Sequence, residues 1–337
     1  MGEQRYARRL AELRHLIDLR LRRSLSVGRP HRLNEACRYV LGGGGKRLRA
    51  VLVVVACRAV GGRTAQALDA GCAVEIMHNF TLVHDDIMDS AATRRGRPTV
   101  HIRWDLNGAL LTGDVLVGAA YEALLRSSHR ESAPMMRLFT RALIDVCRGQ
   151  ALDLEFAERD RVTLREYFTM IEQKTGRMIA MAAELGGMVG GGGRGERAAL
   201  RRFGHHLGRA FQLQDDLLDV VAEEAELGKT IGGDILERKR TYLLLCALER
   251  ARGADRRVLR ALLRLKGRDR ALRSKTGRAR LIRTVTDIYL RLGVLEDARR
   301  QVRRETDRAL AALKALPQSD DRAMLTWLAE SLVRRVS

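Results

Sequence analysis

Thr81-Leu-Val-His-Asp-Asp-Ile-Met-Asp89 and Phe211-Gln-Leu-Gln-Asp-Asp-Leu-Leu-Asp219 are two similar stretches of this 337-residue chain. Each is an apolar run with helical spacing that ends in the pattern Asp-Asp-x-x-Asp. Positions i and i+4 share a helix face, so the first and last aspartates of each pattern point the same way, and their repulsion destabilises the helix unless a cation binds there. The repeat therefore predicts two acidic helices that face one cavity.

The ligand atoms in both clusters are carboxylate oxygens, with no cysteine nearby, and this set favours a hard cation such as magnesium. A single copy of the pattern is explained equally well by a solvated acidic patch. Because there are two copies, we favour a metal cluster bridged by a diphosphate. The candidate residues are Asp85, Asp86, Asp89, Asp215, Asp216 and Asp219.

Outside these stretches, apolar residues recur at i, i+3, i+4 and i+7 along most of the chain, as amphipathic helices require. Aromatic residues make up only 4 % of the sequence, which argues against extensive β-sheet. We expect an all-α fold, a single domain over residues 1–337 with about 10–13 helices around a central cavity. The expected helices span residues 4–25, 31–41, 47–60, 64–92, 107–128, 133–157, 163–188, 196–226, 234–252, 256–265, 276–292, 294–314 and 319–335.

The sequence has no uninterrupted apolar run of transmembrane length, so we expect no stable membrane insertion. The basic segment 5–23 is interpreted as a first helix that packs on the body rather than as a targeting peptide. The cysteines are scattered without a C-x-x-C spacing, which is typical of buried thiols in a reducing cytoplasm. They are Cys37, Cys57, Cys72, Cys147 and Cys246.

The net charge of +21 raises nucleic acid as a possible partner. Only seven of the 62 basic residues are Lys, however, and the Arg residues are spread over every segment. A basic helical nucleic-acid-binding protein would need Arg gathered on one face with base-reading or stacking residues, and the sequence has neither. We interpret the charge as a compositional bias and expect no nucleic-acid partner.

Lysine is rare here, so its positions are informative. Lys46 follows Gly42–Gly45 at an expected helix N-terminus, where free backbone N–H groups favour anions. Lys174 begins Lys-Thr-Gly, Lys229 lies in a glycine-containing loop after the second acidic helix, and Lys239 lies in Arg-Lys-Arg-Thr. These lysines are candidate diphosphate ligands, although chance also explains four positions out of seven.

Arg94 and Arg95 follow the first acidic cluster, and Arg is suited to bidentate phosphate contacts. His78 lies seven residues, about two helical turns, before Asp85 and nearly on its face. We interpret His78 as a residue of the same cavity, with a core histidine as the alternative.

With these motifs in place, the sequence resembles the trans-isoprenyl diphosphate synthase (polyprenyl synthetase) family over nearly its whole length. Two departures are visible: Ala50 stands where the family usually has Pro, and Arg238 where Gly usually precedes Lys239. The matching motifs, in family order, are Gly44-Gly45-Lys46-Arg47-Leu48-Arg49, Asp85–Asp89 with Arg94-Arg95-Gly96, Gly113-Asp114, Gly149-Gln150 with Asp153, Lys174-Thr175, Phe211-Gln212 with Asp215–Asp219, Gly228-Lys229 and Lys239-Arg240-Thr241.

The resemblance implies an isoprenoid synthase fold and a role for each motif. Isopentenyl diphosphate is expected at Lys46, Arg49, His78 and Arg95. The allylic diphosphate is expected at Arg94, Lys174, Thr175, Gln212, Lys229 and Lys239. Asp85, Asp89 and Asp215 are the implied Mg²⁺ ligands, supported by Asp86, Asp216 and Asp219, and the implied catalytic set adds Lys174 and Lys229 to these six aspartates.

The resemblance also implies the reaction, in which an allylic diphosphate ionises, isopentenyl diphosphate attacks the cation and a proton leaves. Such a prenyltransferase of isoprenoid biosynthesis is expected to be a cytoplasmic homodimer. A class I terpene cyclase is the closest rival, but such enzymes usually lack the isopentenyl diphosphate site. A non-catalytic partner subunit is disfavoured because the aspartates of both motifs are intact.

The residues before the first acidic cluster bear on product length. Met77, Phe80, Thr81 and His84 form a stripe at helical spacing beside the aspartates. In the family, an aromatic residue five positions before the motif is typical of short-chain synthases, and Phe80 has that place; packing in the core is the alternative. Thr81 is small, which favours the C20 product geranylgeranyl diphosphate over C15 farnesyl diphosphate or a longer chain.

Overall fold

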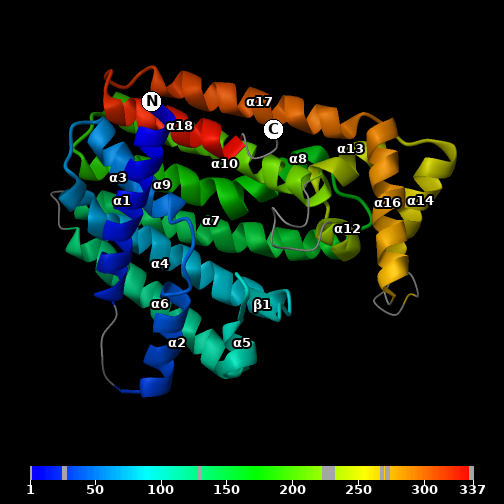
Figure 1. Cartoon of the computed structure of the whole chain (residues 1–337), viewed down its shortest axis with the longest axis horizontal. Helices are drawn as coiled ribbons and strands as arrows, with labels where there is room; N and C mark the ends of the chain where they lie inside the picture. The colour runs from blue at the N-terminus through cyan, green and yellow to red at the C-terminus, as the bar shows by residue number, and fades with distance from the viewer. Residues whose placement is uncertain are drawn as a thin grey trace. The chain divides into compact units, whose positions relative to one another are not determined.

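The computed structural model describes residues 2–24, 29–127, 131–221, 232–265, 269 and 274–333. These residues are almost entirely helical, with one two-stranded hairpin, so the all-α prediction is confirmed (Figure 1). The chain divides into two compact units. The first unit contains residues 1–143, 178–204 and 312–328, and the second contains 144–177, 205–311 and 329–337. The prediction of a single domain over residues 1–337 stays a prediction.

The first unit is built on α3, where nine of twelve residues are buried because the sequence from Ala50 to Ala59 is almost wholly apolar. Helix α4 packs on α3 and runs beside α6 (Figure 1). Gly186 leaves room for the α9 backbone to approach Val53 of α3 closely. The elements of this unit are α1 (Gly2–Arg22), α2 (His31–Leu41), α3 (Leu48–Ala59), α4 (Thr64–Met88), β1 (Thr93–Arg94), β2 (Arg97–Pro98), α5 (Val100–Arg103), α6 (Leu106–Arg126) and most of α9 (Arg177–Val189).

The second unit has its own apolar core, which includes Tyr167, Leu213 and Tyr289. Its elements are α8 (Leu164–Ile171), η1 (Glu172–Gly176), α12 (Gly233–Glu237), α13 (Tyr242–Arg250), α14 (Gly253–Arg264), α16 (Lys275–Arg291) and most of α17 (Val294–Leu313). The boundary between the units falls within α7 (Ser132–Glu158), α10 (Arg194–Val221) and α18 (Asp320–Val333).

Two expected helices are interrupted, and both interruptions carry residues that the sequence singled out. The expected helix 163–188 contains a π-helical turn, η1, between α8 and α9. The expected helix 234–252 is broken between α12 and α13, because Arg238 ends α12 in the left-handed region with φ +58 and the Thr241 side chain caps α13 by accepting from Leu244 N at 3.4 Å. The prediction of a single helix over 234–252 was therefore wrong.

The expected helix 64–92 ends earlier than predicted, at Met88, and Ser90 turns the chain with φ +51. The chain then forms the hairpin β1–β2, in which Thr93 pairs with Pro98 and Arg94 with Arg97. The spacing of apolar residues predicted neither this hairpin nor the short helix α5.

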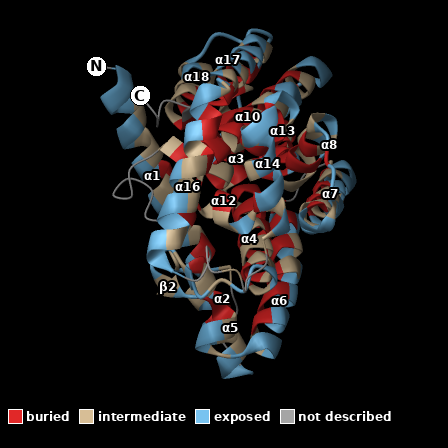
Figure 2. Ribbon diagram, turned by 90° about the vertical axis from the view of Figure 1, so that its right-hand side faces the viewer, coloured by how far each residue is buried: buried red, intermediate tan, exposed pale blue. Residues whose placement is uncertain are grey.

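Helix α6, which has a buried and an exposed side (Figure 2), bears on the expectation that no uninterrupted apolar run has transmembrane length. By length and composition α6 is able to cross a membrane. Its apolar window is 44 % buried, and Asp114 and Glu122 lie on its exposed side. The core helix of a water-soluble protein passes the same test, so α6 is weak evidence for a membrane span.

Candidate active site

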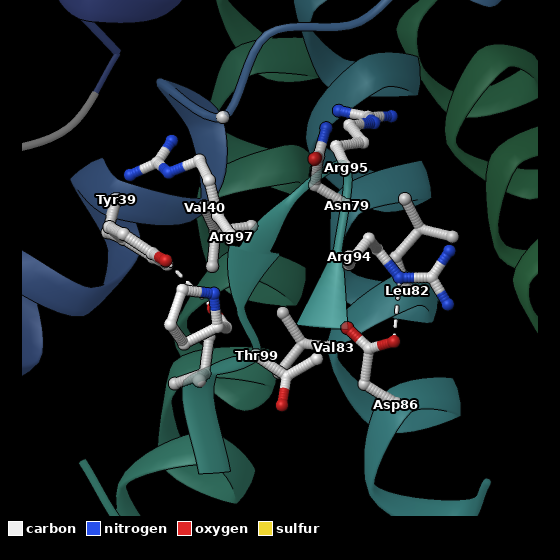
Figure 3. Close-up of a pocket in the computed structure, with 13 residues that line it drawn as sticks. Tyr39, Val40, Asn79, Leu82, Val83, Asp86, Arg94, Arg95, Arg97 and Thr99 are labelled. Carbon is white, nitrogen blue, oxygen red and sulfur yellow. Dashed lines mark hydrogen bonds and ion pairs between the residues drawn. The ribbon is translucent and has the colours of Figure 1, made fainter. Parts of the chain in front are cut away.

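The first acidic motif ends α4, and its three aspartates differ in exposure. Asp86 is 5 % exposed and accepts a bond from Arg94 Nε at 2.7 Å (Figure 3). Asp85 is half-buried, and Asp89 is exposed at the end of the helix. Asp86 is therefore held by the protein, whereas the side chains of Asp85 and Asp89 are more accessible to a cation.

The β1–β2 hairpin positions both arginines of the Arg94-Arg95 pair. Its two turn residues, Arg95 and Gly96, have φ +53 and φ +72, the backbone of a tight two-residue hairpin. Arg94 lies on β1 next to Asp86, while Arg95 lies at the turn and donates to the Gly44 carbonyl. A Cβ at Gly45 would lie 2.8 Å from Arg95 Nη1, and Gly45 has φ +123, a backbone conformation that residues with a side chain rarely adopt.

The glycine loop leads into α3 and carries further cations. Lys46 is exposed just before α3 begins, and Arg49 lies in the first turn. Arg49 Nη1 donates to His78 Nε2 on α4 at 3.2 Å. The structure thus brings Arg49, His78 and Arg95 together as predicted. Lys46 lies on the glycine loop, just before α3.

The electrostatics of this group favour an anionic ligand. Burial lowers the pKa of Arg49 and of Arg95. Burial also lowers the pKa of His78 well below 6.5, reinforced by Arg49 and Arg95, so the imidazole is neutral and accepts the bond from Arg49. Among the described residues, the buried Arg49 Nε has no hydrogen-bond partner. A diphosphate would relieve the repulsion between the guanidiniums and supply acceptors for them.

A small pocket of about 50 Å³ opens between the hairpin, α2 and α4 (Figure 3). It connects Asp86 and Arg94 with Arg95. Its lining residues are Tyr39, Val40, Gly43, Asn79, Leu82, Val83, Asp86, Arg94, Arg95, Arg97, Pro98, Thr99 and Val100.

The second acidic motif lies on α10, and its middle aspartate is again fixed by the protein. Asp216 is 5 % exposed, and its Oδ2 accepts from the Tyr167 hydroxyl at 2.7 Å and from Tyr242 N at 3.1 Å. Burial raises the pKa of Asp216 to about 6. Asp215 is exposed, and Asp219 accepts from Asp234 N at 3.0 Å.

The turn η1 presents Lys174 and Thr175. A π-helical turn is rare and is common at functional sites. Gly149 of α7 has no Cβ, which lets its backbone approach the Lys174 backbone closely. Lys174 Nζ lies 2.5 Å from Asp153 Oδ2, and Thr175 Oγ1 donates to Gln212 Oε1 at 2.8 Å.

Gln212 links these residues to the acidic motif, since its Nε2 donates to Asp216 Oδ1 at 3.1 Å. Lys174, Thr175 and Gln212 are thus assembled around α10 within the second unit. Lys239 also lies near the second motif, 2.8 Å from Glu237 Oε2 and 3.6 Å from Oδ1 of Asp234, the residue whose N–H bonds Asp219, and it opposes the rise that burial causes in the pKa of Asp219. Lys229 lies outside the described residues.

Each acidic motif can supply part of the ligand set of a metal ion. Within the described ranges, no three His, Cys, Asp or Glu side chains are grouped closely enough to hold an ion by themselves. Magnesium usually takes one or two carboxylates and fills its other positions with water and substrate phosphate. The accessible aspartates, Asp85 and Asp89 in one motif and Asp215 in the other, suit that mode of binding.

The residues predicted to control product length lie on α4 against α6. Phe80 is 8 % exposed and meets the His84 ring edge-on, with 4.9 Å between ring centroids. His84 Nε2 lies 3.3 Å from the Leu110 carbonyl oxygen. Met77 is fully buried, and Thr81 Oγ1 donates to the His78 carbonyl within α4.

Several residues of these networks were not assigned roles from the sequence. Tyr167 and Asp234 contact the second motif, and Arg47 pairs with the buried Glu75 behind the glycine loop. A charged residue inside the apolar run of α4 was the available signal for Glu75. Tyr167 gave no comparable signal, because aromatic residues are ordinary members of a core.

Comparisons with known proteins agree with this arrangement. A polyprenyl synthetase family model matches residues 30–276. A short chain isoprenyl diphosphate synthase from Methanothermobacter thermautotrophicus is 37 % identical over 97 % of both chains. A geranylgeranyl diphosphate synthase from Methanosarcina mazei is 41 % identical over 69 % of this chain and 73 % of its own. The crystal structure of geranylgeranyl pyrophosphate synthetase from Pyrococcus horikoshii has a TM-score of 0.91 and 34 % identity, covering 99 % of both chains.

Prenyl synthases of this kind act on isopentenyl and allylic diphosphates and use a divalent metal. The family match and the full-length relative both extend well beyond half of the sequence. The chain therefore belongs to the polyprenyl synthetase family and is a prenyltransferase.

Proposed function

We propose that this protein is a Mg²⁺-dependent synthase that condenses isopentenyl diphosphate head-to-tail with allylic diphosphates to give geranylgeranyl diphosphate. The observation that carries the proposal is the cationic group of Arg49, Arg95 and neutral His78 in the same unit as the first acidic motif. A class I terpene cyclase needs the acidic motif but not a second diphosphate pocket. Two separate groups of candidate diphosphate ligands, one within each unit, support a reaction that joins two diphosphate substrates.

The chain's own residues divide the work between the two substrates. Lys46, Arg49 and Arg95 bind and orient the diphosphate of the isopentenyl substrate. Lys174, Thr175 and Gln212 serve the allylic diphosphate, together with Arg94, Lys229 and Lys239. Cations placed where negative charge develops on the leaving group lower the barrier to ionisation.

Asp85, Asp89 and Asp215 would hold Mg²⁺ with the allylic diphosphate. When bound there, Mg²⁺ supplies Lewis-acid stabilisation of the leaving diphosphate. Asp86 and Asp216 accept hydrogen bonds from protein groups, so we assign them to support rather than to direct ligation. The apolar side chains along α4 keep water from the allylic cation.

The C20 product is supported by three observations. The Methanosarcina mazei relative and the Pyrococcus horikoshii structure both bear the name geranylgeranyl diphosphate or pyrophosphate synthase. Phe80 is packed against His84, so its ring is suited to act as a fixed floor for the growing chain. The small Thr81 leaves more space than an aromatic residue would, which favours C20 over C15.

We propose a homodimer in which α6 packs against a second copy. Leu110, Leu111 and Val115 are 41 %, 54 % and 37 % exposed and form an apolar strip on α6, as buried interface helices do. Asp114 and Glu122 are also exposed, and charges suit a protein interface better than a lipid interior. Sedimentation analysis of Leu111→Arg tests this: we expect a monomer, and an unchanged dimer would contradict the interface.

The location we propose is the cytoplasm. All five cysteines are free, and four of them are buried. Burial raises the pKa of Cys37 and Cys57 to about 11, so these thiols are unreactive, as expected for structural cysteines in a reducing compartment.

The two-pocket assignment is tested by comparing single variants of two lysines. Lys46→Ala should raise the KM for isopentenyl diphosphate and leave the KM for the allylic substrate nearly unchanged. Lys174→Ala should have the opposite effect. If both variants raised the KM for the same substrate equally, the proposed assignment would be wrong.

A further inference from the structure

A buried ion pair lies behind the predicted isopentenyl diphosphate residues. Arg47 Nη1 is 3.0 Å from Glu75 Oε1, and the two side chains are 2 % and 3 % exposed. Exposed ion pairs usually have little effect, but removal of one partner from a buried pair leaves an uncompensated charge in the core. Loss of either charge from this pair is therefore expected to destabilise the folded chain.

Three elements hold the Arg47 guanidinium besides its own loop. Glu75 lies on α4, Asp18 of α1 accepts from Arg47 Nε at 2.9 Å, and the Leu41 carbonyl at the end of α2 accepts from Nη2 at 2.5 Å. These bonds use donor positions along both edges of the planar group. The guanidinium is thus fixed in position as well as in charge.

The backbone at Arg47 is unusual in a way that matters to its neighbours. Arg47 has φ +50, in the left-handed region that costs a non-glycine residue about 1–2 kcal/mol. Strain of this kind persists only where surrounding contacts maintain it. At this turn the Arg47 side chain is buried, whereas Lys46, one residue earlier, is exposed, and Arg49 follows in the first turn of α3.

Glu75 is also placed to offset charge among the guanidiniums. It lies three residues, about one helical turn, before His78 on α4. Burial lowers the pKa of Arg49 and of Arg95, and Glu75 is the strongest influence that opposes this in both cases. The Glu75 carboxylate therefore offsets part of the positive charge of Arg49 and Arg95 when no anion is bound.

We infer that Glu75 is a positioning residue for the isopentenyl diphosphate site. Through Arg47 it links the loop that carries Lys46, and the first turn of α3 that carries Arg49, to the turn of α4 that carries His78. Glu75 does not contact the substrate in this role, since a carboxylate would repel a diphosphate. The inference rests on the proposed function, which places isopentenyl diphosphate at Lys46, Arg49, His78 and Arg95.

The first test is Glu75→Gln, which keeps the shape and a hydrogen-bond acceptor but removes the charge. We expect the KM for isopentenyl diphosphate to rise by about tenfold, because the charge-assisted contact to Arg47 becomes a weaker neutral one. The KM for the allylic substrate should stay within about twofold of the wild-type value. The matched control is Asp69→Asn, which removes the charge from the Arg20–Asp69 ion pair between α1 and α4, with bonds of 2.8 and 2.7 Å, a pair in which Arg47 takes no part. The control should leave both KM values unchanged.

A second variant separates positioning from stability. In Arg47→Met/Glu75→Leu both charges are replaced by apolar groups, a change that is often neutral or stabilising for a buried pair. We expect this double variant to fold, with a melting temperature lowered because Asp18 and the Leu41 carbonyl also lose their bonds from Arg47, and yet to show a raised KM for isopentenyl diphosphate. A wild-type KM in the folded double variant would overturn the inference, even if Glu75→Gln alone failed to fold.

Lys46→Ala distinguishes this inference from the proposed function. If Lys46→Ala leaves the KM for isopentenyl diphosphate unchanged, the substrate assignment itself is wrong. If Lys46→Ala raises that KM while the Glu75→Gln and double variants do not, the assignment stands and the positioning role of Glu75 is wrong.

Discussion

Asp86 and Asp216 occupy the same place in the two acidic motifs, and each is 5 % exposed and hydrogen-bonded to a neighbour within its own unit. Arg94 Nε contacts Asp86 and the Tyr167 hydroxyl contacts Asp216, both at 2.7 Å. Asp85 and Asp215 are more accessible. The two motifs therefore share a division between one aspartate held by the protein and one available to a ligand.

This division predicts a large loss of turnover when an accessible aspartate is removed, and a smaller loss when a contact to a buried aspartate is removed. Asp85→Ala or Asp215→Ala should reduce turnover by several orders of magnitude with the fold intact, because each removes a carboxylate assigned to the metal. Tyr167→Phe, which removes one bond to Asp216, should reduce turnover far less, by about tenfold. Steady-state rates at saturating Mg²⁺, with circular dichroism as the fold control, check this. Near-normal turnover of Asp85→Ala would contradict it.

Product length should depend on Phe80. In Phe80→Ala the ring that packs on His84 is lost, so we expect products longer than C20 with the metal site intact. Radiometric chromatography of the dephosphorylated products measures the shift. Ile76→Leu, a change of similar volume at a buried α4 residue outside the predicted product-length set, is the control and should keep the C20 product. An unchanged distribution in an active Phe80→Ala enzyme would mean that another residue sets the length.

Arg238 should show the cost of its backbone conformation. It stands in the left-handed region at the end of α12, and it replaces the glycine expected from the family resemblance. Arg238→Gly and Arg238→Ala both remove its bond to the Leu265 carbonyl, but only glycine adopts this conformation without strain. We expect the glycine variant to be the more stable by about 1 kcal/mol, which thermal unfolding of the pair would measure. An alanine variant of equal or greater stability would be the opposite result.

His78 should make stability depend on pH. Its pKa lies well below 6.5 because it is buried and faces Arg49 and Arg95. Between that lowered pKa and 6.5, the unfolded chain binds a proton that the folded chain does not, so stability is full above 6.5 and is lost as the pH falls. The contribution of His78 should be lost between about pH 7 and about pH 5, while Asp216, whose pKa is raised to about 6, contributes in the opposite direction, so the wild type is compared with a His78 variant. The melting temperature of His78→Gln, which keeps an acceptor for Arg49, should fall less than that of the wild type as the pH decreases. Equal pH slopes for the two proteins would contradict this role of His78.

Much of the fold was predictable because helical spacing is a local property of the sequence. Residues 31–41 and 47–60 match α2 and α3 closely, and both acidic motifs lie on helices as predicted. The hairpin was not predictable from alternation, since each strand has only two residues. The break at Arg238 has no Gly or Pro to mark it, and its bond to the Leu265 carbonyl is a tertiary contact.

The candidate site divides in the same way. Repetition of Asp-Asp-x-x-Asp and the rarity of lysine indicated the ligands, because charged groups in unusual patterns are visible in a sequence. Their partners are not visible, since they come from distant segments. Tyr167 and Asp216 are 49 residues apart, and Arg47 and Glu75 are 28 apart. Such pairs are determined by packing, which a single sequence does not display.

The central claim is tested most directly by incubating the purified full-length protein with radiolabelled isopentenyl diphosphate, farnesyl diphosphate and Mg²⁺, with a parallel sample in excess chelator. We predict that the label appears in a C20 all-trans prenyl diphosphate and that the chelated sample forms none. A labelled C20 product in excess chelator, or no elongated product from any allylic primer with Mg²⁺, would contradict the account.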